Sequence, residues 1–197
     1  MEGQGTVENQ PVFLVADDLG KTFSFLSTIP YQQLPAYDKQ YRGGFSEPGI
    51  AFMPDASIIC LLRTENGIKV GSAPSYICRS TDGGKSWSDA DFFDSLGVWP
   101  DLVTLKNGVT LACYGRPGFF VRATSDPSGR VWDDRTTVIE PELAADGSEI
   151  RNTCGYGGLL ALGDDTALLV YSHFKWPNEE GIPAKTILAR KLRAVTG

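Results

Sequence analysis

The sequence predicts an all-β protein built from small antiparallel sheets, and three observations carry this prediction. Helical periodicity is nearly absent from the 197 residues, and short runs rich in Val, Ile, Leu and aromatic residues recur instead. The 22 glycines and 12 prolines place turn residues between those runs. A turn motif also repeats along the chain, which is typical of folds made of equivalent sheets.

The apolar runs predict thirteen strands. They lie near residues 11–16, 22–29, 48–53, 57–63, 75–80, 86–93, 99–105, 108–115, 118–124, 131–139, 153–162, 166–173 and 185–191. Turn residues at 54–57, 106–108 and 163–165 each join two runs, which favours hairpins there. The longest expected loops are 30–46, 140–152 and 174–184, and loops of this length in a compact all-β chain are often functional.

The repeated turn motif reads Ser/Thr-x-Asp-x-Gly-x-Ser/Thr-aromatic. Residues 80–87 fit it at every position, whereas 16–23 and 124–132 fit it with small departures. The Asp side chain can accept hydrogen bonds from backbone N–H groups of its own loop, and the Gly permits a positive φ. Structural roles are therefore expected for Asp18, Asp82, Asp126, Trp87 and Trp132. The acidic spacing of an EF-hand is missing, so no metal is expected at these turns.

The strands group as a terminal pair (11–29), two four-strand units (48–93 and 99–139) and a three-strand unit (153–191). These lengths suit the four-stranded blades of a β-propeller, of which the chain holds about three. Closed propellers need more blades than this. The chain is therefore a fragment, a partial ring completed by a second copy, or an open stack with exposed edges. Residues 11–197 are expected to form this one partial-ring domain, preceded by a disordered tail at 1–10.

Composition and charge exclude several classes of partner. The net charge of −6 argues against nucleic acid or an anionic membrane as a partner. No apolar run approaches the roughly 20 residues that a membrane-spanning helix needs. Residues 1–10 are polar and acidic and do not resemble a signal peptide, but a secreted or periplasmic parent protein stays open. The four cysteines (Cys60, Cys78, Cys113 and Cys154) lack C-x-x-C spacing and are expected to be buried free thiols, with a disulfide or metal site as the alternative.

The turn motifs resemble the Asp-boxes, or BNR repeats, of the sialidase (neuraminidase) superfamily. That family also has a glutamate at the start of a blade and an arginine at the end of the blade's second strand, and Glu47 and Arg63 resemble them. Arg116 resembles a second arginine of that family, and Arg122 is a weaker candidate for the same role. Tyr156, in Tyr-Gly-Gly-Leu, resembles the family tyrosine that opens the next blade. The chain therefore resembles the C-terminal half of the six-bladed propeller of that family.

This resemblance implies an exo-α-sialidase-like glycoside hydrolase that acts on sialic acid or another anionic sugar without a cofactor. Arg63 and Arg116 would bind the sugar carboxylate in bidentate fashion. Tyr156 would be the nucleophile, because a neutral phenol avoids repulsion by that carboxylate, and Glu47 would take its proton. The family's third arginine and its acid–base aspartate have no counterpart in this chain.

Two more residues are candidates for sugar binding. Trp99-Pro100-Asp101 opens a blade at the position equivalent to Glu47-Pro48, so Trp99 either stacks on a sugar or fills the core between blades, and Asp101 is a candidate for the pocket. Structural alternatives stay open for the other site residues as well. The sequence therefore leaves three hypotheses: a carbohydrate-cleaving enzyme, a non-catalytic propeller that binds glycan or protein, and a truncated form that assembles with a second copy.

Overall fold

The structure is a computed structural model that describes residues 9–31, 44–64, 74–150 and 154–195, and within these ranges it contains strands, turns and loops but no helix. The strands are β1 (Val12–Val15), β2 (Ser24–Thr28), β3 (Phe45–Phe52), β4 (Ile58–Thr64), β5 (Ser75–Ser80), β6 (Asp91–Asp94), β7 (Val98–Thr104), β8 (Thr110–Gly115), β9 (Phe119–Thr124), β10 (Thr136–Ile139), β11 (Glu142–Leu143), β12 (Glu149–Ile150), β13 (Cys154–Ala161), β14 (Thr166–Pro177) and β15 (Pro183–Arg193).

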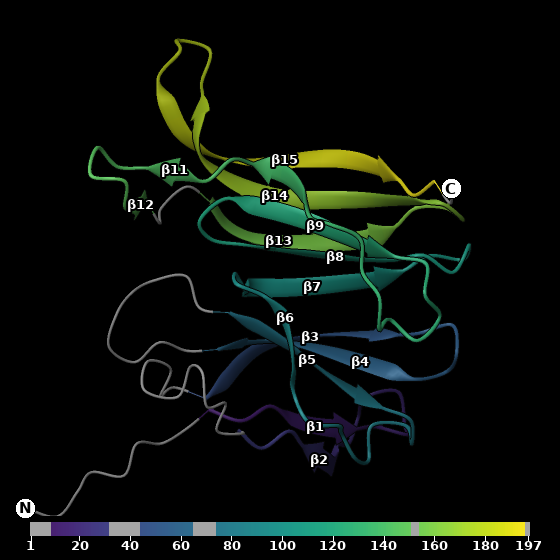
Figure 1. Cartoon of the computed structure of the whole chain (residues 1–197). Coiled ribbons are helices and arrows are strands. Elements are labelled where there is room, and N and C mark those ends of the chain that lie inside the picture. Colours follow the sequence, from purple (N-terminus) through teal and green to yellow (C-terminus); the bar gives the residue numbers. More distant parts are fainter. Residues whose placement is uncertain (1–8, 32–43, 65–73, 151–153, 196–197) are drawn as a thin grey trace, which may run out of the picture.

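The strands form antiparallel sheets that follow one another in chain order. The hairpin β1–β2 is followed by the blades β3–β6 and β7–β10, and then by the three-stranded blade β13–β15; β11 and β12 form a separate hairpin. Figure 1 shows the sheets stacked from β1–β2 at the bottom to β15 at the top. The predicted grouping into a pair, two four-stranded units and a three-stranded unit is confirmed. The fold is that of β-propeller blades, about three of them.

The predicted tight turns close hairpins. The Met53 N–H donates to the Ser57 carbonyl at 2.8 Å, the Leu105 N–H to Val109 at 2.8 Å, and the Leu162 N–H to Thr166 at 2.9 Å. These turns were recognisable because Gly, Asn, Asp and Pro are the residues that such backbone conformations favour.

Several predicted boundaries are wrong. β6 and β10 begin only at Asp91 and Thr136, because residues 86–87 and 131–132 belong to the repeated turns and the three residues after each turn are not in a strand. The expected loop 140–152 contains the hairpin β11–β12. The expected loop 174–184 is mostly an extension of β14 and β15, which pair as far as Pro177 and Pro183. Both hairpins are largely exposed, so no alternation of apolar and polar residues marks them in the sequence.

Most of the expected tail and of the expected loop 30–46 lies outside the described residues, in 1–8 and 32–43. At the edge of those ranges Asn9 is described, and its carbonyl accepts the Phe45 N–H at 2.8 Å.

The core lies between the blades. One cluster joins Ala51 and Leu61 of the first blade to Leu102 and Tyr114 of the second. A second cluster joins the second blade to the third and contains Cys113, Phe119, Val121, Leu169 and Tyr171 among others. Each blade therefore buries its apolar side chains mainly against its neighbour, as sheets packed face to face do.

The three aspartates of the repeated turns bind the backbone of their own loops. Asp82 Oδ1 accepts the N–H groups of Lys85 at 3.0 Å and Ser86 at 2.9 Å, and Asp18 Oδ1 accepts those of Lys21 and Thr22, both at 2.9 Å. In the third turn, Asp126 accepts hydrogen bonds from the backbone N–H groups of Ser128, Arg130 and Val131.

The two tryptophans of these turns pack against neighbouring rings. Trp87 stacks on Phe13 with ring centroids 4.6 Å apart, and its Nε1–H donates to the Ser27 hydroxyl at 3.1 Å. Trp132 packs edge-on against Phe93 at 5.2 Å. These two turns are therefore each fastened to a sheet by their tryptophan.

These turns lead to a prediction about acid stability. The hydrogen bond from the Ser128 N–H is the largest of the effects that hold the pKa of Asp126 at about 2, below its ordinary value of 3.8. Because the folded pKa is depressed, this stabilisation is present above about pH 4 and is lost as the pH falls towards 2. We expect the urea midpoint to fall less steeply between pH 4 and pH 2 in Asp126→Asn than in the wild type. Asp134→Asn, at an exposed site outside the turn, should keep the wild-type slope; equal slopes in the two variants would contradict the prediction.

The four cysteines are free and buried, as the sequence predicts. Burial is the main cause that raises the pKa of Cys78 to about 12, so the thiol stays protonated at neutral pH. Among the described residues there is no group of three or more potential His, Cys, Asp or Glu ligands for a metal ion. The described ranges also hold no helix of the length and apolarity that a membrane crossing requires.

Candidate functional site

The first strands of the three blades carry the same irregularity near their starts. The register shifts between Ser46 and Gly49 in β3, between Val98 and Asp101 in β7, and between Cys154 and Gly157 in β13. At each of these bulges two residues face a single residue on the partner strand: Glu47 and Pro48, Trp99 and Pro100, Gly155 and Tyr156. Bulges redirect side chains and are over-represented next to active sites. The repeat thus brings Glu47, Trp99 and Tyr156 to the same end of neighbouring blades.

Glu47 connects the first two blades at this end. Its Oε1 accepts a hydrogen bond from Arg63 Nη1 at 2.6 Å, which is possible because Arg63 lies opposite Ser46 in the register. Its Oε2 accepts the backbone N–H of Trp99 at 2.8 Å. Both carboxylate oxygens are therefore engaged, and the side chains of Glu47 and Arg63 are mostly buried.

The contacts at this end of the blades extend into the second and third blades through Trp99, Tyr156 and Arg116. The rings of Trp99 and Tyr156 are 4.4 Å apart between centroids, and both are exposed. The Arg116 guanidinium carbon lies 6.0 Å from the Tyr156 ring centroid, and Arg116 Nε donates to the Cys154 carbonyl at 3.1 Å. Within the described residues, Nη1 and Nη2 of Arg116 have no hydrogen-bond partner. This leaves the end of the guanidinium available to an anion.

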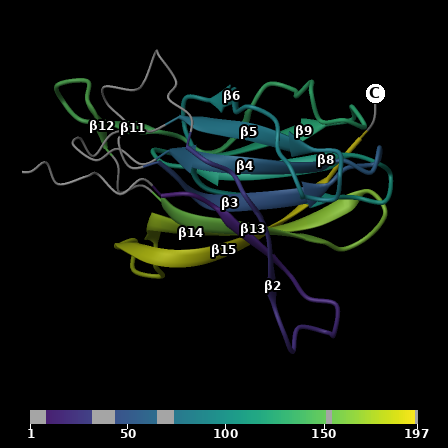
Figure 2. The same cartoon turned by 90° about the horizontal axis from the view of Figure 1, so that it is seen from below.

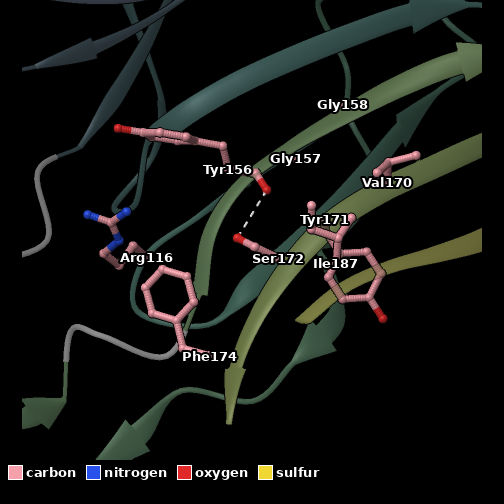
Figure 3. A pocket seen from close by; sticks show the side chains of 9 residues that line it. All are labelled: Arg116, Tyr156, Gly157, Gly158, Val170, Tyr171, Ser172, Phe174 and Ile187. Atoms are coloured by element: carbon pink, nitrogen blue, oxygen red, sulfur yellow. Dashed lines mark hydrogen bonds between the residues drawn. The ribbon is translucent and has the colours of Figure 1, made fainter. Parts of the chain in front are cut away.

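A pocket of about 620 Å³ opens beside these two side chains. Figure 3 shows Arg116 and Tyr156 next to each other at one side of it, with Phe174 below and the β13 and β14 backbones along the other side. Its lining residues are Arg116, Tyr156, Gly157, Gly158, Val170, Tyr171, Ser172, Phe174 and Ile187. The sequence interpretation missed the contribution of β14; alternate residues 170, 172 and 174 could have indicated it, because they share one face of a strand.

The backbone is strained at this site. Glu47, Trp99 and Arg116 have φ values of 48°, 49° and 67°, and they are three of the five non-glycine residues with positive φ in the described part of the chain. Such conformations cost about 1–3 kcal/mol each and cluster at functional sites. The strain favours a functional role for this end of the blades over a purely structural one.

Asp101 does not line this pocket. Its Oδ2 accepts the backbone N–H of Leu159 at 2.7 Å, so the carboxylate ties β7 to β13. Arg122, the weaker candidate for the second arginine, donates to the carbonyls of Asp133, Phe93 and Trp132. Its guanidinium therefore serves the packing of blades rather than the site.

Glu47 and the Tyr156 hydroxyl are not hydrogen-bonded to each other among the described residues. Each of them contacts Trp99 instead: Glu47 binds its backbone and Tyr156 contacts its ring. A proton transfer from Tyr156 to Glu47 therefore requires a rearrangement of this site.

Comparisons with known proteins support the fold. No family profile matches the sequence, and a search of curated proteins finds no match either. Among solved structures, a protein of unknown function from Dyadobacter fermentans is similar with a TM-score of 0.65 and 20% identity, over 92% of this chain and 45% of that one. The α-L-arabinofuranosidase Arb93A from Fusarium graminearum gives a TM-score of 0.61 at 15% identity, over 92% of this chain and 54% of that one.

The NanB sialidase from Streptococcus pneumoniae is a third similar structure, with a TM-score of 0.57 and 10% identity over 89% of this chain and 46% of that one. The chain thus spans about half the length of these three structures. The named enzymes among them are β-propeller glycosidases, so the fold of this chain is glycosidase-like.

Proposed function

We propose that this chain provides part of the carbohydrate site of a sialidase-like glycoside hydrolase, and that Arg63 and Arg116 bind the carboxylate of an anionic sugar. The observation that carries the proposal is the open end of Arg116 beside Tyr156 at the mouth of a pocket. The chain of contacts from Arg63 through Glu47 and Trp99 to Tyr156 supports it, as does the glycosidase-like fold.

The chemistry of an anionic sugar fits these residues. The sugar carboxylate next to the reacting carbon repels a carboxylate nucleophile but not a neutral phenol. Tyr156 would supply this phenol as the nucleophile. Glu47 would accept the phenol proton once its Oε2 releases the Trp99 N–H. Trp99 would stack on the sugar, because its exposed ring lies beside Tyr156.

A second candidate function is binding of a glycan without hydrolysis. It is favoured by the occupation of both Glu47 oxygens and by the lack of a recognisable acid–base aspartate in the sequence. In this case the arginines and aromatic rings would hold the sugar, and Glu47 would be a structural link between the first two blades.

The test is binding of free N-acetylneuraminic acid by isothermal titration calorimetry. We expect Arg116→Gln to weaken binding about 10- to 100-fold, because a charge-assisted contact to the carboxylate contributes about 1.5–3 kcal/mol. The methyl ester of the same sugar should bind the wild type at least as weakly as the acid binds the variant, because esterification removes the charge that both arginines would contact. Arg193→Gln, in an exposed ion pair with Asp165, is the matched control and should leave binding unchanged.

Equal affinity of the wild type and Arg116→Gln would rule out the proposed arginine role. Hydrolysis of a fluorogenic sialoside at pH 4 to 8, with Tyr156→Phe beside the wild type, separates the two candidates. Turnover that Tyr156→Phe abolishes supports the enzyme, whereas binding without turnover supports the second candidate.

A further inference from the structure

Another pocket, of about 490 Å³, lies where the outer strands of the first two blades meet. Its lining comes from β5 and β6 of the first blade, from β9 of the second, and from the repeated turn that follows β9. In Figure 2, which looks along the stack of sheets, β5, β6 and β9 lie on the same side of the molecule. None of its lining residues lines the pocket beside Tyr156, so the two are separate sites.

This pocket is positively charged, on a protein whose net charge is −6. Three arginines, Arg79, Arg122 and Arg130, line it together with one carboxylate, that of Asp91. The lining therefore carries an excess of two positive charges. Within the described residues, none of the three guanidinium groups forms an ion pair with a carboxylate. Cations gathered in one pocket without such partners attract an anion.

Arg79 connects the first blade to the repeated turn of the second. Its Nη2 donates to the Gly129 carbonyl at 2.5 Å, whereas its Nε and Nη1 are buried and have no hydrogen-bond partner in the part of the chain that the structure describes. Burial is the main cause that lowers the pKa of Arg79, and the charge of Arg130 adds to it; the guanidinium still stays charged at neutral pH. A charge partly withdrawn from water is weakly screened, so it attracts an anion in the pocket more strongly than an exposed arginine does.

The other two arginines differ in how they are held. Arg122 donates to three backbone carbonyls, and its guanidinium carbon lies 4.8 Å from the Phe93 ring centroid. These neutral partners orient the side chain without cancelling its charge, and a guanidinium has more donors than three carbonyls use. Arg130 is exposed, and its backbone N–H, rather than its side chain, binds Asp126. The Arg130 side chain can therefore close on a ligand that Arg122 already faces.

The rest of the lining indicates a ligand larger than a bare ion. The volume of about 490 Å³ lies within the range of about 300–1,000 Å³ that small-molecule sites have, and such sites combine aromatic walls with a few polar groups. Phe92 and Trp132 line the pocket, and Phe92 is 54% exposed. An excess of two positive charges matches a phosphate group, which carries about −1.5 to −2 near neutral pH and forms charge-assisted hydrogen bonds with arginine clusters.

We propose that this pocket binds a small organic phosphate of the size of a sugar phosphate. Arg122 and Arg130 donate hydrogen bonds to the phosphate oxygens, and Arg79 adds its charge. The rings of Phe92 and Trp132 contact the organic part. The site shares no residue with the carbohydrate site proposed above, so it is an additional binding site and goes beyond that function.

Isothermal titration calorimetry of the intact chain with glucose 6-phosphate near neutral pH tests the proposal. The wild type should bind it with a Kd of about 1 mM or below, and binding should weaken as salt is added. Arg130→Glu should weaken binding at least about tenfold, because it places a carboxylate beside the phosphate. This variant should keep the wild-type melting temperature, since the Arg130 side chain is exposed and its turn uses only its backbone N–H.

Lys85→Glu is the matched control. Lys85 has the same place in its own turn, where its backbone N–H donates to Asp82, and it is exposed but does not line the pocket; the variant should keep the wild-type affinity. Inorganic phosphate should bind more weakly than the ester, because it lacks the part that contacts the rings. Glucose 6-sulfate should also bind more weakly, because its ester group carries a single negative charge.

The proposal is overturned if glucose 6-phosphate shows no binding up to about 10 mM, if Arg130→Glu binds it as tightly as the wild type, or if Lys85→Glu weakens binding as much as Arg130→Glu does. Inorganic phosphate that binds as tightly as the ester overturns the assignment to an organic phosphate. These probes carry no carboxylate, so a failure here leaves the test of Arg116 unaffected.

Discussion

Replacing Gly157 with alanine is expected to destabilise the protein by about 3 kcal/mol or more, whereas the same change at Gly158 should cost less than about 1 kcal/mol. A Cβ atom at Gly157 would lie 2.2 Å from Cζ of Phe119, and two further ring atoms are within 3.1 Å. Phe119 is fully buried and its ring stacks on Tyr171, so it has no free space to move into. A Cβ atom at Gly158 would meet only Asp101 Oδ2, at 3.6 Å, an ordinary contact.

Urea unfolding of the wild type and the two glycine variants measures this difference. Gly157→Ala should cost less stability in the Phe119→Leu background than in the wild type, because the smaller leucine side chain removes the clash. The difference in stability between Phe119→Leu and the double variant Gly157→Ala/Phe119→Leu measures this cost. If Gly157→Ala is as stable as Gly158→Ala, the close packing of β13 on β9 described here is wrong. Because Tyr156 precedes Gly157, the same clash would also displace the candidate site.

The second large effect is expected at Asp94, which links the first two blades. Its Oδ2 accepts the Tyr114 hydroxyl at 2.8 Å, and its Oδ1 accepts the Leu96 N–H and Arg135 Nη1, both at 3.1 Å. Tyr114 is fully buried, and burial, together with the Asp94 charge, raises the pKa of its hydroxyl. The phenol therefore stays protonated and continues to donate at every pH the fold tolerates.

Asp94→Ala should destabilise the protein by about 3–5 kcal/mol, because it leaves a buried hydroxyl, a backbone N–H and a half-exposed arginine without their acceptor. The control is Asp164→Ala, which removes an exposed ion pair with Lys106 and should change stability by less than about 0.5 kcal/mol. Unfolding free energies of both variants, and of Tyr114→Phe alone and combined with Asp94→Ala, give the coupling between the two residues. Similar losses in Asp94→Ala and Asp164→Ala would show that the network does not hold the blades together.

Much of this fold could be predicted from local patterns. The order of the sheets follows from apolar runs separated by turn residues, and the repeated turns follow from Asp82 and its two relatives, because these interactions span only a few residues. The pairing of Glu47 with Arg63 could also be predicted, because a glutamate at the start of one strand and an arginine at the end of the next strand meet across a hairpin. Exposed hairpins such as β11–β12 were missed because their pairing has no hydrophobic pattern.

The rest was decided by tertiary structure. Glu47 binds the backbone of Trp99 across 52 residues of sequence, Tyr156 contacts the Trp99 ring, and Asp101 turns to the next blade instead of the pocket. These contacts depend on bulges, and a bulge shifts the direction of a side chain without leaving a reliable mark in residue type. The sequence by itself determined the blades, their turns and the residues at their ends. Only the packing of one blade on another decided which of those residues meet, because packing is set by register and distance between segments far apart in the chain.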